Sequence, residues 1–215
     1  MRITLSLIIM LLCLGSQVTA QIKAVTEDGK IVILNMNGTW KFQDEESNEI
    51  TEIPMSNIRY TKDTKANFLL KSKKTNFGFW INPQKWTITP STKEEATEYG
   101  LRLKDEDLFA LILTEKIEVP LETLKNIALK NAKEAAPDAT IAKEEYRIVN
   151  GKKVLMLTIT GNIQGINFIY FGYYYSNKSG TVQFLTYTAQ NMYDGYLSEC
   201  ETLLNGLVDI TENNR

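Results

Sequence analysis

The last third of the sequence most constrains the fold, because it alternates apolar runs with short turn signals. Four of these runs predict strands, at Ile141–Val149, Lys153–Thr160, Ile163–Ser176 and Thr181–Thr188. Asn150-Gly151 and Gly161-Asn162 separate the first three runs, and Asn177–Gly180 precedes the fourth. Such turn signals favour tight hairpins, which join antiparallel neighbours. The pattern therefore predicts an antiparallel meander.

Two amphipathic helices accompany these strands. Pro120 suits the first position of a helix, where its missing N–H costs nothing, and Pro137 stops that helix. After the last strand, apolar residues recur at helical spacing: Tyr193, Tyr196, Leu197, Cys200, Leu203, Leu204 and Leu207. Trp86 is expected in a loop, and Ser91 starts a short helical turn. Earlier strands are predicted at Asn76–Asn82, Thr97–Leu103 and Leu108–Lys116. The fold class is α+β, an antiparallel sheet flanked by helices.

Residues 1–20 have the three parts of a secretory signal peptide. Arg2 precedes an apolar run from Ile3 to Leu14, and Val18-Thr19-Ala20 supplies a small-residue cleavage site. The run is shorter than the roughly 20 residues of a membrane-spanning helix, and an uncleaved anchor is the alternative. We expect cleavage after Ala20 and a periplasmic or secreted protein with no membrane span once the signal is removed.

The remainder divides into a small unit, a charged segment and a main domain. Residues 21–43 predict a β-meander, because Asp28-Gly29 and Asn37-Gly38 separate three short apolar runs. Residues 44–66 predict a charged linker, residues 67–210 the α+β domain, and residues 211–215 a tail. The linker is acidic at first, and a basic stretch follows over residues 57–74. The basic stretch pairs with the acidic one, binds an acidic surface or is simply solvated, and we favour solvation.

The sequence contains no histidine and two cysteines, Cys13 and Cys200. This composition removes histidine-based triads and dyads, most zinc sites and any disulfide framework. Cys200 lies within the C-terminal apolar stripe, and we expect it to be buried. A net charge of −2 argues against nucleic acid as a partner.

This order of elements is similar to that of the PsbP/DcrB-like family over about residues 76–210. The likeness lies in residues with structural rather than chemical roles: Phe79, Pro83 and Trp86, then Asp107–Leu111, Asn150-Gly151, Gly161, Gly165, Phe171–Tyr174, Gly180–Gln183 and the closing helix. The resemblance implies an α/β/α sandwich and a non-catalytic accessory or binding protein, and it transfers no ligand residues. Ala24–Phe42 also resembles a short segment found near the mature N-terminus of many exported bacterial proteins, which implies no activity.

The most distinctive stretch is Asn167–Tyr175, which is aromatic on both faces of its predicted strand. Alternation places Phe168, Tyr170 and Tyr174 on one face, and Ile169, Phe171, Tyr173 and Tyr175 on the other. This pattern is typical of a central strand covered on both sides. The alternative is a binding surface for a sugar, a peptide or a lipid headgroup, formed by Trp80, Trp86, Tyr173 and Tyr175.

Carboxylates are the remaining candidates for acid–base chemistry. Glu115, Glu118 and Glu145 are the candidates for a carboxylate-dependent hydrolase, which needs two carboxyls converging in one cleft. Their spacing does not demonstrate convergence, and solvated charge explains them more simply. Asp105-Glu106-Asp107 is better explained as a polar hairpin tip than as a calcium site. We therefore expect no catalytic residue, no metal and no cofactor.

The sequence as a whole predicts an exported, non-catalytic accessory or binding module of the bacterial cell envelope. Its expected partner is a protein or another envelope component. The hydrolase remains one alternative, and a small-ligand carrier with an aromatic-lined pocket is another.

Overall fold

In the computed structural model the chain is described over residues 22–26, 29, 31–34, 40–42, 52–90 and 97–211. It divides into two compact units, residues 1–49 and residues 50–215. The predicted signal peptide with Cys13, the acidic residues 44–49 and the predicted helical turn after Ser91 lie outside the described residues. Neither of the described helices combines the length and the apolar character needed to cross a membrane.

The N-terminal unit contains three short strands, β1 (Ile22–Val25), β2 (Ile31–Leu34) and β3 (Trp40–Phe42). They pair antiparallel in the order β1-β2-β3, which is the order of a meander. Gly29, between β1 and β2, has φ of 81°, a conformation that favours glycine. Its N–H donates to the carbonyl oxygen of Thr26 at 2.9 Å.

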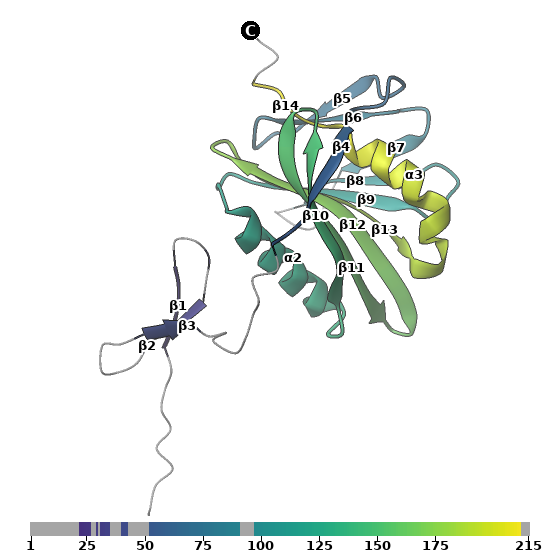
Figure 1. Ribbon diagram of the computed structural model, residues 1–215. Helices are drawn as coiled ribbons and strands as arrows, with labels where there is room; N and C mark the ends of the chain where they lie inside the picture. The colour runs from purple at the N-terminus through teal and green to yellow at the C-terminus, as the bar shows by residue number, and fades with distance from the viewer. Residues whose placement is uncertain are drawn as a thin grey trace, which may run out of the picture. The chain divides into compact units, whose positions relative to one another are not determined.

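The larger unit is built on one sheet with the order β4-β10-β11-β12-β13-β9-β8-β7 (Figure 1). Every neighbouring pair is antiparallel except β4 and β10, which are parallel. The strands are β4 (Met55–Tyr60), β7 (Trp86–Pro90), β8 (Thr97–Leu103), β9 (Phe109–Glu115), β10 (Thr140–Val149), β11 (Lys152–Ile163), β12 (Ile166–Asn177) and β13 (Gly180–Ala189).

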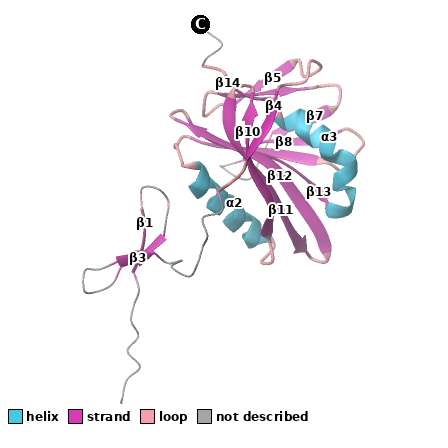
Figure 2. Ribbon diagram, viewed as in Figure 1, coloured by secondary structure: helices cyan, strands magenta, loops and turns pink. Residues whose placement is uncertain are grey.

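Two helices lie on opposite faces of this sheet, α2 (Leu121–Ala135) and α3 (Tyr193–Leu204) (Figure 2). Helix α2 packs on β10, β11 and β12, where Leu124 and Ala128 meet Tyr174 in one core cluster. Helix α3 packs on β12 and β13, and its Cys200 shares the other cluster with Tyr173. Strand β12 is therefore a central strand covered on both sides, as the aromatic alternation predicts.

A second antiparallel sheet has the order β14-β6-β5, formed by β5 (Phe68–Lys71), β6 (Phe77–Ile81) and β14 (Leu207–Asp209). Phe77 and Phe79 are fully buried in the same cluster as α3. The ring of Phe79 meets that of Phe184 on β13 edge to face, with centroids 5.1 Å apart. The small sheet and α3 thus cover one face of the large sheet, and α2 covers part of the other face.

One hairpin turn lies three residues beyond its predicted place. Asn150 and Gly151 have φ of 47° and 81° and form the expected turn between β10 and β11. Gly161 and Asn162, however, lie within β11, and the chain turns at Gln164 and Gly165 instead, with φ of 52° and 87°. Gly161 serves packing rather than turning, since a Cβ there would lie 2.9 Å from the Phe168 ring. The prediction of a turn at Gly161-Asn162 was wrong.

Three other expectations need correction. Trp86 begins strand β7 rather than lying in a loop, because its ring is inside the core. Helix α3 ends at Leu204, and Leu207 pairs with Phe79 in β14 instead of continuing the helical stripe. The predicted linker at 44–66 contains strand β4, so the larger unit begins before residue 67. An edge strand tolerates charges such as Arg59, which is why its composition resembled a linker.

The predicted burial of Cys200 is confirmed. Its side chain is almost fully buried in the helix face that packs on the sheet. Burial raises the pKa of the Cys200 thiol to about 11.

Candidate functional site

A short turn between β6 and β7 brings two of the predicted binding residues together. Phe79 and Ile81 of β6 point into the core, so alternation turns Trp80 to the other face, where it is partly exposed. The carbonyl oxygen of Asn82 then accepts hydrogen bonds from the N–H groups of Lys85 and Trp86, at 3.1 and 3.0 Å. These bonds fold the turn tightly, and Trp80 and Trp86 line the same pocket.

Three separate parts of the chain form this pocket, which we call the tryptophan pocket. Its volume is about 230 Å³. Helix α3 contributes residues one helical turn apart, which share one side of the helix. The lining consists of Asp63, Lys65 and Ala66 before β5, Trp80, Asn82, Lys85 and Trp86 around the β6–β7 turn, and Ser198, Glu199, Thr202 and Leu203 of α3.

The charged groups of the tryptophan pocket are only partly paired. Lys85 Nζ forms an ion pair with Glu199 Oε1. The other carboxylate oxygen, Glu199 Oε2, is buried and has no hydrogen-bond partner among the described residues. Lys62 Nζ lies 4.8 Å from the centroid of the Trp80 ring, a cation–π contact. The pocket thus offers an aromatic surface, the amines of Lys65 and Lys85, and a carboxylate with one buried, unpartnered oxygen.

The other two predicted binding residues lie elsewhere. Tyr173 is fully buried. Its hydroxyl accepts a hydrogen bond from Arg147 Nη1 at 2.9 Å and donates one to Asn205 Oδ1 at 3.0 Å. Burial raises the pKa of the Tyr173 hydroxyl. Tyr175 is partly buried, with its ring 5.5 Å from that of Phe77. Trp80, Trp86, Tyr173 and Tyr175 therefore do not form one surface.

Sequence reasoning missed the buried charge beside Tyr173. The Arg147 side chain is only 5% exposed and pairs with Glu145 at 2.6 Å and with Glu201 at 2.9 Å. Burial acts to lower the pKa of Arg147, but Tyr173, Glu145 and Glu201 outweigh burial and raise it overall. The guanidinium also lies 4.4 Å from the Tyr60 ring centroid. This network ties α3 to the sheet, and its only sequence signal was an arginine inside an otherwise half-apolar strand.

The three carboxylates proposed for hydrolysis do not converge in a described pocket. Glu115 and Glu118 are exposed, and Glu145 is engaged by Arg147. None of the three lines either described pocket. Within the described residues no group of acidic or cysteine side chains is arranged to hold a metal ion.

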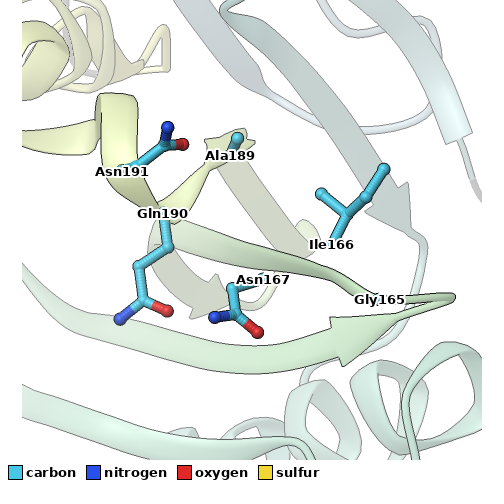
Figure 3. Close-up of a pocket in the computed structure, with 6 residues that line it drawn as sticks. All are labelled: Gly165, Ile166, Asn167, Ala189, Gln190 and Asn191. Carbon is cyan, nitrogen blue, oxygen red and sulfur yellow. The ribbon is translucent and has the colours of Figure 1, made fainter.

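A second, open pocket of about 560 Å³ lies where β12 begins and β13 ends (Figure 3). Its lining is Gly165, Ile166, Asn167, Ala189, Gln190 and Asn191, so the polar groups are amides without charge. Ile166 is 63% exposed. The aromatic residues 168–175 line neither described pocket, and the aromatic lining found there comes from Trp80 and Trp86 of the tryptophan pocket.

Comparison with known proteins identifies the fold. No protein-family model matches the sequence, and no curated protein matches it. The solution structure of cyanobacterial PsbP (CyanoP) from Synechocystis sp. PCC 6803 matches with a TM-score of 0.51 at 14% identity, over 66% of this chain and 91% of that chain. The larger unit therefore has a PsbP-like α+β fold, in agreement with the sequence prediction.

Two other solved structures are similar at lower TM-scores. PA94 from Pseudomonas aeruginosa matches at 0.42 with 10% identity, over 66% of this chain and 95% of that chain. LpqN of Mycobacterium tuberculosis, involved in cell envelope biogenesis, matches at 0.43 with 12% identity, over 66% of this chain and 88% of that chain. Both likenesses are too weak to add to the assignment of the fold.

Proposed function

We propose that this protein is an exported, non-catalytic binding module of the cell envelope, and that it binds through the tryptophan pocket. One observation carries the proposal: Trp80, Trp86, Lys65 and Glu199, from three separate parts of the chain, converge on one small pocket. Convergent polar groups beside aromatic rings are typical of ligand sites. The pattern of residues 1–20 supports export.

A binding role fits the chemistry of the pocket better than a catalytic role. The sequence has no histidine, and the candidate carboxylates Glu115, Glu118 and Glu145 lie outside the pocket. Two carboxylates line the pocket, but Glu199 is held in an ion pair by Lys85, and Asp63 Oδ1 accepts a hydrogen bond from the N–H of Lys65. The groups in the pocket are therefore suited to hold a ligand by hydrogen bonds and ring contacts.

Tryptophan fluorescence offers a direct test, because the chain has only three tryptophans, Trp40, Trp80 and Trp86. In a Trp40→Phe background, the whole signal comes from the two pocket rings. We would titrate this chain with glycan, peptide and lipid fractions from a digested cell envelope. The expected result is a saturable change with one fraction.

Two charge variants locate the binding. Lys65→Met removes a pocket amine and is expected to weaken binding at least fivefold. Lys178→Met is the matched control, because Lys178 is an exposed lysine in the β12–β13 turn and lines neither pocket. Absence of saturable binding for every fraction at millimolar concentration would overturn the proposal, as would equal effects of the two variants.

A further inference from the structure

We infer that the tryptophan pocket takes one saccharide unit of an envelope glycan, an inference that rests on the proposed function. The pocket is small. The volume of about 230 Å³ lies below the roughly 300–1,000 Å³ usual for whole small-molecule ligands. The pocket therefore accommodates one ring or one side chain of a longer molecule, and the rest of that molecule extends outside.

One acceptor at the pocket has no partner. Glu199 Oε2 is buried without a hydrogen-bond partner among the described residues, and a buried acceptor without a donor is unfavourable. Lys85 is already engaged with Oε1 of the same carboxylate. Oε2 itself is shielded from solvent, so a ligand hydroxyl meets it when the Glu199 side chain, which is 28% exposed, turns toward the pocket. The resulting charge-assisted bond is stronger than one between neutral groups.

Hydrogen-bond donors and acceptors are mixed around the ring-sized space. Ser198 and Thr202 carry hydroxyls that both donate and accept, and Lys65 carries an amine that only donates. Asn82 Oδ1 already accepts a hydrogen bond from the N–H of Gln84 at 3.0 Å, so the side-chain amide nitrogen of Asn82 is the group that would donate to a ligand. A sugar ring presents several hydroxyls, each a donor and an acceptor, and so matches this set at more than one point.

The aromatic surface and the charges around it also suit a sugar. Lys62 already lies over the Trp80 ring, whose face is negative in its quadrupole and attracts positive charge. Lys62 occupies that face, so a sugar, whose C–H faces are apolar and weakly positive, would contact the part of the Trp80 ring that lines the pocket. The lining has two carboxylates, Asp63 and Glu199, and two amines, Lys65 and Lys85, so it favours no strongly charged ligand.

Soluble tetrasaccharides and a tetrapeptide test this inference in the full chain with Trp40→Phe. We would titrate tetrasaccharides of glucose, N-acetylglucosamine and glucuronate, with tetraalanine as the peptide probe. The expected result is a saturable fluorescence change with at least one tetrasaccharide and none with tetraalanine. Binding of tetraalanine alone would overturn the inference.

Variants of Glu199 and Ser198 tie the sugar to the unpaired oxygen. Glu199→Gln is expected to weaken tetrasaccharide binding at least tenfold, and Ser198→Ala at least threefold. The control Glu134→Gln changes an exposed carboxylate of α2 and should leave the affinity unchanged. Unfolding by urea checks that each variant is folded. Sugar binding that survives both pocket variants would overturn the inference.

The outcomes separate this inference from the proposed function. If an envelope fraction binds but all three tetrasaccharides fail, the saccharide assignment is wrong and the binding module stands. If the envelope fractions, the tetrasaccharides and tetraalanine all fail to bind, both proposals are wrong.

Discussion

Arg147 Nη1 donates a hydrogen bond to the Tyr173 hydroxyl at 2.9 Å, in the interior between strand β10 and helix α3. The same nitrogen lies 2.9 Å from Glu201 Oε1 of α3. This contact gives Tyr173 a structural role, because its hydroxyl connects the buried guanidinium to Asn205 at the end of the helix. Arg147 and Tyr173 thus connect α3 to the large sheet, and neither residue lines the tryptophan pocket.

Removal of this hydroxyl should destabilise the fold without affecting binding. Tyr173→Phe leaves a buried guanidinium donor and the Asn205 amide without their partner, at a cost of about 1–3 kcal/mol. Tyr196→Phe is the matched control, since the Tyr196 hydroxyl bonds to Glu106 in an exposed position, and we expect a change of at most about 0.5 kcal/mol. Urea unfolding measures both. Equal stabilities of the two variants would contradict the structural role.

Alanine substitutions at two glycines should change the stability of the fold in opposite directions. A Cβ at Gly206 would lie 2.1 Å from the carbonyl oxygen of Trp80, so Gly206→Ala forces the backbone apart and should cost about 1–3 kcal/mol. Gly195 lies in α3 with open space around it, and Gly195→Ala should gain about 0.5–1 kcal/mol from helix propensity.

The same pair also tests the pocket. The N–H of Trp80 donates to the carbonyl oxygen of Gly206 at 2.8 Å, so displacement at Gly206 moves the Trp80 ring. Gly206→Ala should weaken ligand binding, whereas Gly195→Ala should not. Thermal unfolding and the fluorescence titration report the two effects. A stabilised Gly206→Ala chain would contradict the close approach.

Cys200 should be inert in the folded protein. Its pKa of about 11, raised by burial, keeps it a thiol at pH 8, and the reactive species is the thiolate. In a Cys13→Ser background, a thiol reagent at pH 8 should label the chain slowly until guanidinium unfolds it. Rapid stoichiometric labelling of the native chain would show that the thiol is exposed.

The raised pKa of Cys200 also predicts a loss of stability in alkali. The unfolded thiol ionises near pH 8.5, whereas the folded thiol ionises near pH 11. The buried, protonated thiol therefore makes its full contribution to the unfolding free energy below about pH 8.5, and this contribution is lost progressively as the pH rises toward 11. Cys200→Ala should show a smaller fall in unfolding free energy between pH 8 and 10, and an identical fall would contradict the prediction.

Glu122 should contribute an acid-dependent part of the stability. The Tyr146 hydroxyl donates to Glu122 Oε1 at 2.5 Å and lowers the pKa of that carboxyl. A lowered pKa means that the stabilisation is present above about pH 4.3, the value for unfolded glutamate, and is lost as the pH falls through the lower folded value. Urea unfolding from pH 7 to 3 should show a shallower decline for Glu122→Gln than for the exposed control Glu134→Gln. Parallel curves of unfolding free energy against pH for the two variants would contradict this prediction.

Local patterns predicted the larger fold well. The alternation in residues 168–175 identified a central strand with helices on both faces, and the spacing around Cys200 identified the helix that buries it. Local patterns failed where tertiary contacts override them. Gly161 has the signature of a turn but is needed for close packing on Phe168, and Leu207 has helical spacing but pairs with Phe79.

The candidate site was predictable only in part. Trp80 and Trp86 are six residues apart, and their aromatic character singled them out. Lys65 and Glu199 are separated by more than half the chain, and nothing local indicates that they meet at one pocket. Tyr173 and Tyr175 share the aromatic character, but the strand carries them into the core and away from that pocket.

Nuclear magnetic resonance of the full chain tests the central claim most directly. The three indole N–H signals of Trp40, Trp80 and Trp86, assigned by single phenylalanine variants, report separately on the N-terminal unit and on the pocket. During titration with the envelope fraction that binds, we predict that the Trp80 and Trp86 indole signals and the amides of Ser198–Thr202 shift along one saturation curve, while Trp40 stays fixed. Saturable shifts confined to the amides around Gly165 and Asn191, with both pocket indoles unmoved, would contradict the claim.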